Sequence, residues 1–146
     1  MYRVLQSISG KNVEASFKAG AAMKKGMFVV KGTDGTVNFP AAATDKNVFI
    51  VGKELIATGA DLLNPDLPDY SDVLENIAEG EYVTLEKPFA GEYYFDDQTT
   101  GTIGSYVLAG TDGKLVSSTD ATKFAVIDSA YKDAGTHAGI KIEVLD

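Results

Sequence analysis

The 146-residue sequence contains no cysteine and no tryptophan, and it has a single histidine, His137. Without cysteine the chain can form neither a disulfide framework nor a thiolate metal site. One histidine does not supply the several imidazoles of a typical zinc or iron site. The lack of tryptophan also weakens a sugar-binding interpretation, because aromatic platforms for sugars favour that residue. The sequence therefore predicts a protein with no bound metal and no other cofactor.

Basic residues are scarce as well: 21 acidic side chains face 13 basic ones, and the net charge is -8. A protein that binds the nucleic-acid backbone normally carries a basic face, and anionic membranes attract basic segments. The apolar runs are too short to span a bilayer, and residues 1–20 lack the apolar segment of a secretory signal. We therefore expect no nucleic-acid partner and no membrane partner.

What the sequence does contain is apolar alternation with a period of two, as in residues 2–8, 13–17 and 140–145. This period is typical of half-buried strands, whose successive side chains point to opposite faces. Continuous apolar runs indicate strands buried on both faces, and 15 glycines fit many short strands. The length favours one domain. We predict a single all-β domain over 1–146, a barrel or sandwich of short antiparallel strands. The continuous runs are Phe28–Val30, Val48–Val51 and Phe124–Ile127.

Two segments depart from the strand pattern. Residues 57–71 contain Pro65 and Pro68 and are expected to form a loop excursion. The next residues predict one short helix near 72–78, with Asp72 as the N-cap, Glu75 three residues later, and Gly80 at the end.

Part of the sequence is repeated. Residues 26–37 match residues 104–115 at a constant offset of 78, and a shorter third copy of the opening stands at 80–83. Each long copy predicts a β-hairpin, with Asp34-Gly35 or Asp112-Gly113 in a type I′ turn. Both duplication and convergence on a common turn solution explain the match. The same offset also pairs Thr44 with Thr122, Val48 with Val126, and Phe49 with Ile127.

Candidates for chemistry are few. His137 lies in a glycine-containing segment before the last strand and is interpreted as a loop residue. Residues 125–131 resemble the Val-Ile-Asp-x-x-Tyr stretch of trimeric dUTPases, and residues 59–62 resemble an early acidic motif of that family. This resemblance implies that Asp128 and Tyr131 hold the deoxyuridine sugar. The family's Arg-Ser-Ser phosphate loop and glycine-rich C-terminal arm are missing, so coincidence is the preferred account and no enzyme is predicted.

Three consecutive aromatic residues, Tyr93, Tyr94 and Phe95, are the last candidate. In a strand at least one of them faces away from a one-sided core, and exposed aromatics mark contact surfaces. The alternative is that both faces of this strand are covered within the fold. An exposed aromatic surface would suit a carbohydrate-binding or surface-binding module of a virion fibre or an adhesin.

Four segments carry a resemblance to a known family: Ala22–Val30, Val48–Lys53, Ile77–Leu85 and Gly139–Val144. With these segments, the layout as a whole resembles the decoration, or cement, proteins of tailed-bacteriophage heads. The resemblance implies a structural protein on the outer surface of the virion capsid, assembled in the host cytoplasm. Its partner would be the major capsid protein, whose neighbouring capsomers it would clamp. Self-association is expected, and a trimer would suit sites of local threefold symmetry.

Capsid contacts are expected in the N-terminal strand, in the proline-containing loop and in the aromatic triplet. The predicted contact residues are Tyr2, Val4, Leu62, Leu63, Leu67, Tyr70, Tyr93, Tyr94 and Phe95.

Overall fold

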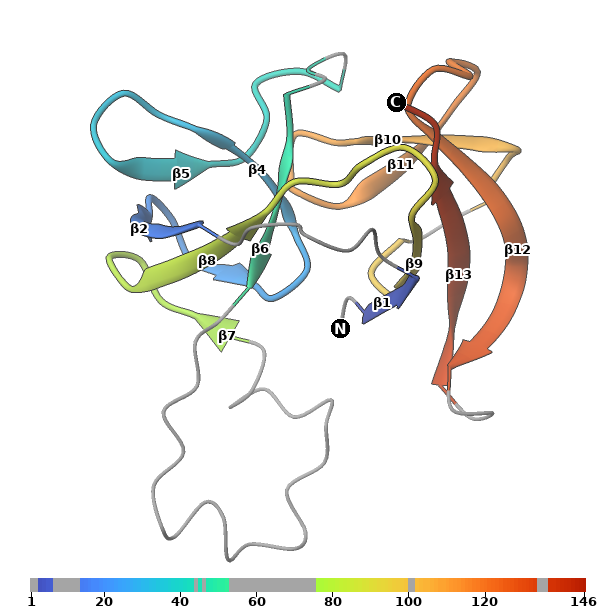
Figure 1. Ribbon diagram of the computed structural model, residues 1–146, viewed down its shortest axis with the longest axis horizontal. Coiled ribbons are helices and arrows are strands. Elements are labelled where there is room, and N and C mark those ends of the chain that lie inside the picture. Colours follow the sequence, from blue (N-terminus) through green and yellow to red (C-terminus); the bar gives the residue numbers. More distant parts are fainter. Residues whose placement is uncertain are drawn as a thin grey trace, which may run out of the picture.

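The computed structural model describes residues 3–6, 14–43, 45, 47–52, 76–99, 102–133 and 137–146. All regular structure in these residues is β-strand, which confirms the all-β class (Figure 1). The strands are β1 (Arg3–Gln6), β2 (Glu14–Ala19), β3 (Met23–Lys24), β4 (Phe28–Lys31), β5 (Thr36–Asn38), β6 (Phe49–Gly52), β7 (Asn76–Ile77), β8 (Tyr82–Glu86), β9 (Tyr93–Asp96), β10 (Tyr106–Ala109), β11 (Leu115–Ser118), β12 (Phe124–Asp133) and β13 (His137–Val144).

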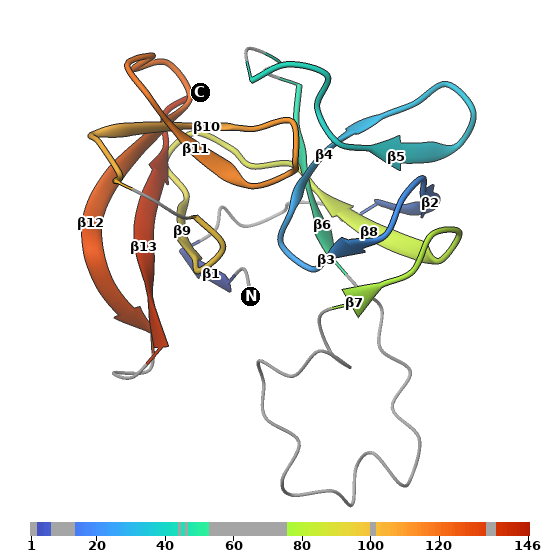
Figure 2. The ribbon, with the colours of Figure 1, turned by 180° about the vertical axis from the view of Figure 1, so that it is seen from behind.

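The strands form a barrel and an open sheet. Five strands close into the barrel in the order β2-β5-β4-β6-β8, and six form the sheet in the order β1-β9-β13-β12-β10-β11. β3 and β7 make a small ribbon of their own. Figures 1 and 2 show the barrel and the sheet side by side. The pairs are antiparallel except β2 and β5, which are parallel.

The repeated segment forms the same hairpin twice, once in each sheet. β4 pairs with β5 and β10 pairs with β11, and the registers agree at the offset of 78. Val30 faces Asn38 in the first hairpin, and Leu108 faces Val116 in the second. The hairpin prediction is therefore confirmed for both copies.

The predicted turn type is wrong. In the second hairpin the Gly113 N–H donates to the Gly110 carbonyl, so Thr111 and Asp112 are the central residues of the turn. The left-handed φ of 78° is at Gly113, after this central pair. A type I′ turn would place positive φ at both central residues of a two-residue loop. Gly35, with φ of 81°, is the equivalent residue of the first hairpin. The loop is longer because β4 ends at Lys31 and β10 ends at Ala109, so two further residues precede each Asp-Gly pair.

The match beyond the hairpin does not correspond to equivalent positions. In the barrel, Phe28 of β4 pairs with Ile50 of β6. Its counterpart Tyr106 pairs with Ala125, whereas a constant offset would require Asp128. The connection from β11 to β12 is shorter than that from β5 to β6, which moves the register. The sequence match of Val48 with Val126 and of Phe49 with Ile127 therefore does not extend to the strand pairing, and Thr44 lies outside the described residues.

The helix predicted near 72–78 is wrong in its described part, and residues 72–75 lie outside the described residues. Asn76 and Ile77 form β7, where Ile77 pairs with Met23 of β3. Ile77 is 1% exposed and belongs to the barrel core. Burial against the barrel outweighs the local capping signal, because most of the stability of a short element comes from its tertiary packing. The loop expected at 57–71 also lies outside the described residues.

The hydrophobic core continues from the barrel into the sheet. One cluster fills the barrel and includes Val29, Val51 and Leu85. The other joins barrel residues such as Phe28 to sheet residues such as Phe124, whose ring centroids are 5.3 Å apart. The Phe28 N–H also donates to the carbonyl of Gly113, so the second turn docks on the barrel. Whether the chain behaves as one domain stays a prediction.

Candidate functional site

The aromatic triplet lies in β9, and two of its three side chains are buried. Tyr94 and Phe95 are both 0% exposed, on opposite faces of the strand, and Tyr93 is half-buried. Tyr94 packs into the core shared with the barrel. Phe95 is covered on the other face by Tyr131 and His137, with centroids 5.8 Å and 5.9 Å away. The expectation that Tyr94 or Phe95 presents a contact surface is therefore wrong, because the fold covers both faces of β9.

The remaining predicted contact residues are not brought together by described structure. Val4 lies in β1, where its backbone pairs with Tyr94. The others lie outside the described residues: Tyr2, Leu62, Leu63, Leu67 and Tyr70.

His137 is the first residue of β13 rather than a loop residue. Its Nε2 atom lies 2.6 Å from Oδ2 of Asp97, the residue that follows β9. The ring is about one-third exposed and meets Phe95 edge-on. The pair therefore ties the end of β9 to the start of β13. Within the described part of the chain, no group of three or more histidine, cysteine, aspartate or glutamate residues is arranged to hold a metal ion.

The two residues of the dUTPase resemblance both lie in β12 and have structural contacts. An Asp128 carboxylate oxygen accepts the Ala130 N–H at 2.9 Å, where the β12–β13 register shifts. Tyr131 packs on Phe95. These contacts support the interpretation of residues 124–131 as a strand of the sheet.

An end of the barrel carries an unpredicted cluster of charge and aromatic rings, which we call the barrel mouth: Phe17, Lys31, Phe49 and Lys87. The Lys31 ammonium lies 4.6 Å from the centroid of the Phe49 ring and 5.1 Å from that of Phe17. The Lys87 ammonium lies 4.8 Å from the same Phe49 ring. Both lysines thus make cation–π contacts with the Phe49 ring. Each such contact contributes about 0.5–1 kcal/mol to folding stability at an exposed site.

Alternation along the strands explains why lysines reach the barrel mouth. Val29 and Leu85 point into the barrel and are almost completely buried. Lys31 and Lys87 lie two residues further along, so they share the inward face at the strand ends. Their stems can cover the rings while the ammonium groups reach water. An apolar residue followed two positions later by lysine at a strand end is the sequence signal that sequence reasoning missed.

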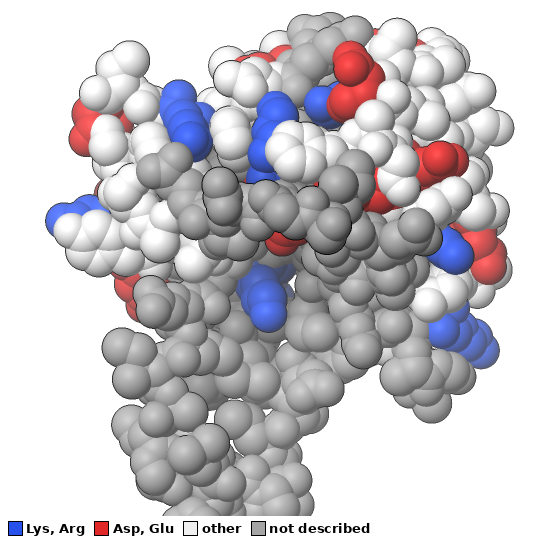
Figure 3. Space-filling view, viewed as in Figure 1, with Lys and Arg blue, Asp and Glu red and all other residues white. Residues whose placement is uncertain are grey.

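The charge at the barrel mouth extends toward the C-terminal end of the chain. Burial of the ammonium group, and then the nearby charge of Lys123, lower the pKa of Lys87 below its ordinary value of 10.5. Lys31 adds to this effect, while Asp45 and Asp146 oppose it. Figure 3 shows Lys and Arg side chains scattered over this face among acidic ones, on a protein whose net charge is -8.

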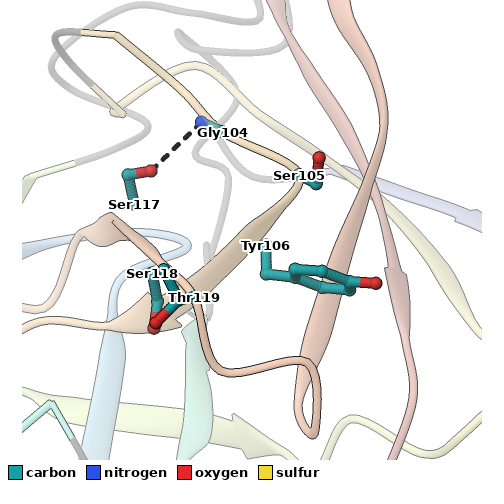
Figure 4. A pocket seen from close by; sticks show the side chains of 6 residues that line it. All are labelled: Gly104, Ser105, Tyr106, Ser117, Ser118 and Thr119. Carbon is teal, nitrogen blue, oxygen red and sulfur yellow. Dashed lines mark hydrogen bonds between the residues drawn. The ribbon is translucent and has the colours of Figure 1, made fainter.

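A second candidate is a depression beside the edge strand of the open sheet. Its lining comes from the start of β10 and the end of β11 (Figure 4). The Ser117 hydroxyl accepts the Gly104 N–H at 3.0 Å, and Ser118 accepts the Asp120 N–H at 3.0 Å. The depression is open and offers hydroxyl groups and one half-buried tyrosine. The lining residues are Gly104, Ser105, Tyr106, Ser117, Ser118 and Thr119.

Searches against family models, curated proteins and solved structures find no match to this chain. The described residues contain no helix that is long and apolar enough to cross a membrane. The site is therefore interpreted from its own geometry.

Proposed function

We propose that this chain is a structural virion protein that binds the outer surface of a tailed-phage capsid. It would stabilise the shell by bridging capsomers of the major capsid protein, and it would self-associate on the shell, with a trimer as one such assembly. The proposal assigns no catalytic activity and no cofactor. The copies would be assembled in the host cytoplasm and carried on the outside of the virion.

The observation that carries the proposal is a frame in which the barrel and the sheet share one core cluster and in which side chains hold the turns. The core spans the barrel and the sheet through Phe28 and Phe124. A protein that bridges capsomers under strain must be rigid, because a flexible segment extends before it transmits force between them. Many copies would then reinforce the shell through avidity.

Six aspartates accept the backbone N–H two residues further along, which is the Asx-turn arrangement. Five of them lie in turns or at strand ends, and Asp128 lies at the register shift within β12. At Asp34 the Thr36 hydroxyl donates as well, and this hydroxyl and then the Thr36 N–H hold the pKa of the Asp34 carboxyl below its ordinary value of 3.8. Part of the acidic excess is therefore structural. The donor residues are Thr36, Asn47, Gln98, Lys114, Thr122 and Ala130, and their acceptors are Asp34, Asp45, Asp96, Asp112, Asp120 and Asp128.

The test is a binding experiment with expanded shells, assembled from the major capsid protein of the same genome and lacking this chain. We expect saturable binding in a sedimentation assay and a higher disruption temperature for decorated shells. An acidic β-protein of similar size and charge serves as the control. Absence of saturable binding would refute the proposed function.

The alternatives have weaker support. A sugar platform at the aromatic triplet is disfavoured, because Tyr94 and Phe95 are buried. A dUTPase-like activity would need Asp128 and Tyr131, which already contact Ala130 and Phe95. A glycan array and a pyrophosphate-release assay with dUTP and magnesium would test these two alternatives.

A further inference from the structure

The second hairpin docks on the first hairpin through its turn. Gly113, the left-handed residue of that turn, accepts the Phe28 N–H through its carbonyl at 2.8 Å. A Cβ built on Gly113 would lie 2.7 Å from a ring atom of Phe39 and 3.2 Å from Cβ of Met27. Gly113 therefore lies against the base of the first hairpin, where β4 begins and β5 ends. The chain thus contains one example of a Gly-Thr-Asp-Gly turn seated at the base of its own repeated hairpin.

The residues that meet Gly113 have counterparts at the base of the second hairpin. The registers of the two hairpins agree at the offset of 78, so these counterparts are equivalent in structure as well as in sequence. All three counterparts line the open depression beside the edge strand (Figure 4). The place that is filled in the first hairpin is therefore open in the second, within the described part of the chain. Met27, Phe28 and Phe39 correspond to Ser105, Tyr106 and Ser117, in that order.

The turn of the first hairpin is exposed where the turn of the second is buried. Gly35 corresponds to Gly113 and has the same left-handed φ. A Cβ built on Gly35 would meet nothing within 4 Å, so the face that Gly113 buries is open at Gly35. Thr33 and Asp34 beside it are exposed as well. Figures 1 and 2 show the β4–β5 turn at one side of the molecule and the open sheet at the other, so the turn lies far from the depression of its own chain.

We infer that the β4–β5 turn of one molecule docks in the depression at the base of the β10–β11 hairpin of a second molecule of this chain. The repeat selects this occupant, because a turn of the same sequence already docks at the corresponding place within the chain. The two surfaces are different, so the contact is head to tail and its repetition closes a ring or extends a row. This deepens the proposed function and rests on it only for the setting, since crowding on a shell raises the local concentration of the partners.

The side chains on the two surfaces are chemically complementary. The depression carries hydroxyl groups where the first hairpin has methionine and phenylalanine. The Ser117 and Ser118 hydroxyl oxygens each accept a backbone N–H, and a hydroxyl that accepts a bond can still donate its own hydrogen. On the turn, both described bonds from Thr36 go to Oδ1 of Asp34. Oδ2 of the exposed Asp34 can therefore accept a hydroxyl of the depression.

Backbone groups make the contact between molecules differ from the contact within one chain. The Gly35 carbonyl accepts the Lys18 N–H at 3.0 Å, so it has a partner within its own barrel. The Gly110 N–H donates within the β10–β11 hairpin, and bonds alternate along a ladder, so the Tyr106 N–H also points to β11. The hydrogen bonds between molecules are therefore formed by side chains, and the open face of Gly35 supplies the close approach.

The first experiment uses pairs of engineered cysteines, because the chain has none of its own. One preparation carries Thr33→Cys in the turn, and the other carries Thr119→Cys in the depression. Docking brings the two thiols close enough for a disulfide, which requires Cα atoms within about 7 Å. Mixed in a glutathione redox buffer, this pair should form the mixed dimer at least about tenfold faster than a control pair, because docking raises the effective concentration of the thiols. The control pair is Lys132→Cys with Thr119→Cys, since Lys132 is also exposed.

The second experiment follows backbone amide signals by NMR over a series of protein concentrations. We expect shifts at Thr33–Gly35 and at Gly104–Tyr106 together, because a head-to-tail contact uses both surfaces. Thr119→Trp, which fills the depression, should abolish both sets of shifts, and the matched control Lys132→Trp should leave them unchanged. The inference is overturned if the cysteine pair reacts no faster than its control. It is also overturned if the concentration series moves neither surface or only one of them.

Binding to expanded shells separates this inference from the proposed function. If the cysteine pair reacts selectively and wild type does not bind shells, the docking contact stands and the proposed function fails. If wild type binds shells and the cysteine pair reacts no faster than its control, in solution and on the shell, the docking contact fails and the proposed function stands. Selective reaction together with saturable shell binding supports both proposals.

Discussion

The repeated hairpin allows one substitution to be compared at two equivalent positions in the same molecule. Gly35 and Gly113 have φ of 81° and 78°, so alanine at either position is strained by about 1–2 kcal/mol. A Cβ at Gly35 would meet nothing within 4 Å. A Cβ at Gly113 would lie 2.7 Å and 2.8 Å from ring atoms of Phe39, and 3.2 Å from Cβ of Met27. Overpacking of this kind adds about 1–3 kcal/mol.

We therefore expect Gly35→Ala to lower the free energy of unfolding by about 1–2 kcal/mol, and Gly113→Ala by about 2–5 kcal/mol. The corresponding loss in Tm is about 4 °C for each kcal/mol in a chain of this length. The effect of alanine on the unfolded chain is common to both variants and cancels in their difference.

Urea denaturation at neutral pH, followed by circular dichroism, measures these differences. Gly80→Ala is the control, because Gly80 has φ of 86° and its added Cβ would also meet nothing within 4 Å. It should behave like Gly35→Ala. Equal destabilisation by Gly35→Ala and Gly113→Ala would refute the reasoning, since it would mean that the second turn does not dock on the barrel.

Three further predictions concern the core and one buried carboxyl. Phe28→Ala and Phe124→Ala should each lower the free energy of unfolding by about 3–5 kcal/mol, because both rings are buried. A double-mutant cycle should give a coupling energy of about 0.5–1.5 kcal/mol between the two rings. Each variant should unfold in a single transition, and a biphasic transition would contradict the shared core. Gly139→Ala should cost about 3 kcal/mol in the same assay, because its Cβ would lie 2.4 Å from the Asp96 carbonyl and 2.3 Å from Phe95, and a cost below that of Gly35→Ala would contradict this. Burial raises the pKa of Asp96 above its ordinary value of 3.8, so its folded form favours the proton and its contribution to stability is lost as pH rises through the folded pKa. Asp96→Asn should therefore gain stability relative to wild type as pH rises from about 4 to 8, and a constant difference would contradict this.

The hairpins could be predicted from sequence because their signals are local. Apolar runs precede Gly32–Gly35 and Gly110–Gly113, and the last glycine of each loop allows a left-handed turn. The turn type was wrong because the strand ends, and not the Asp-Gly pair, decide the loop length. The helix prediction at Asn76–Ile77 was wrong because burial of Ile77 against the barrel is a tertiary effect that no capping pattern reports.

The candidate site was less predictable than the fold. The aromatic triplet could be recognised, but which faces of β9 are covered depends on Tyr131 and His137, about forty residues away in sequence. The barrel mouth could not be recognised as a cluster, because Lys31 and Lys87 meet only when β4 and β8 both pair with β6. Their inward direction at strand ends was nevertheless readable from the positions of Val29 and Leu85.

Net charge describes this protein poorly at the scale on which a partner would bind. Screening limits the reach of an exposed charge to about 10 Å at moderate salt, so a partner responds to local groups and not to the total. Several aspartates that make up the surplus are occupied in their own turns, as Asp34 is with Thr36. Lysines scattered along the sequence meet instead at the barrel mouth. The charge at the barrel mouth is itself mixed, because Asp45 and Asp146 act on Lys87 together with Lys123 and Lys31.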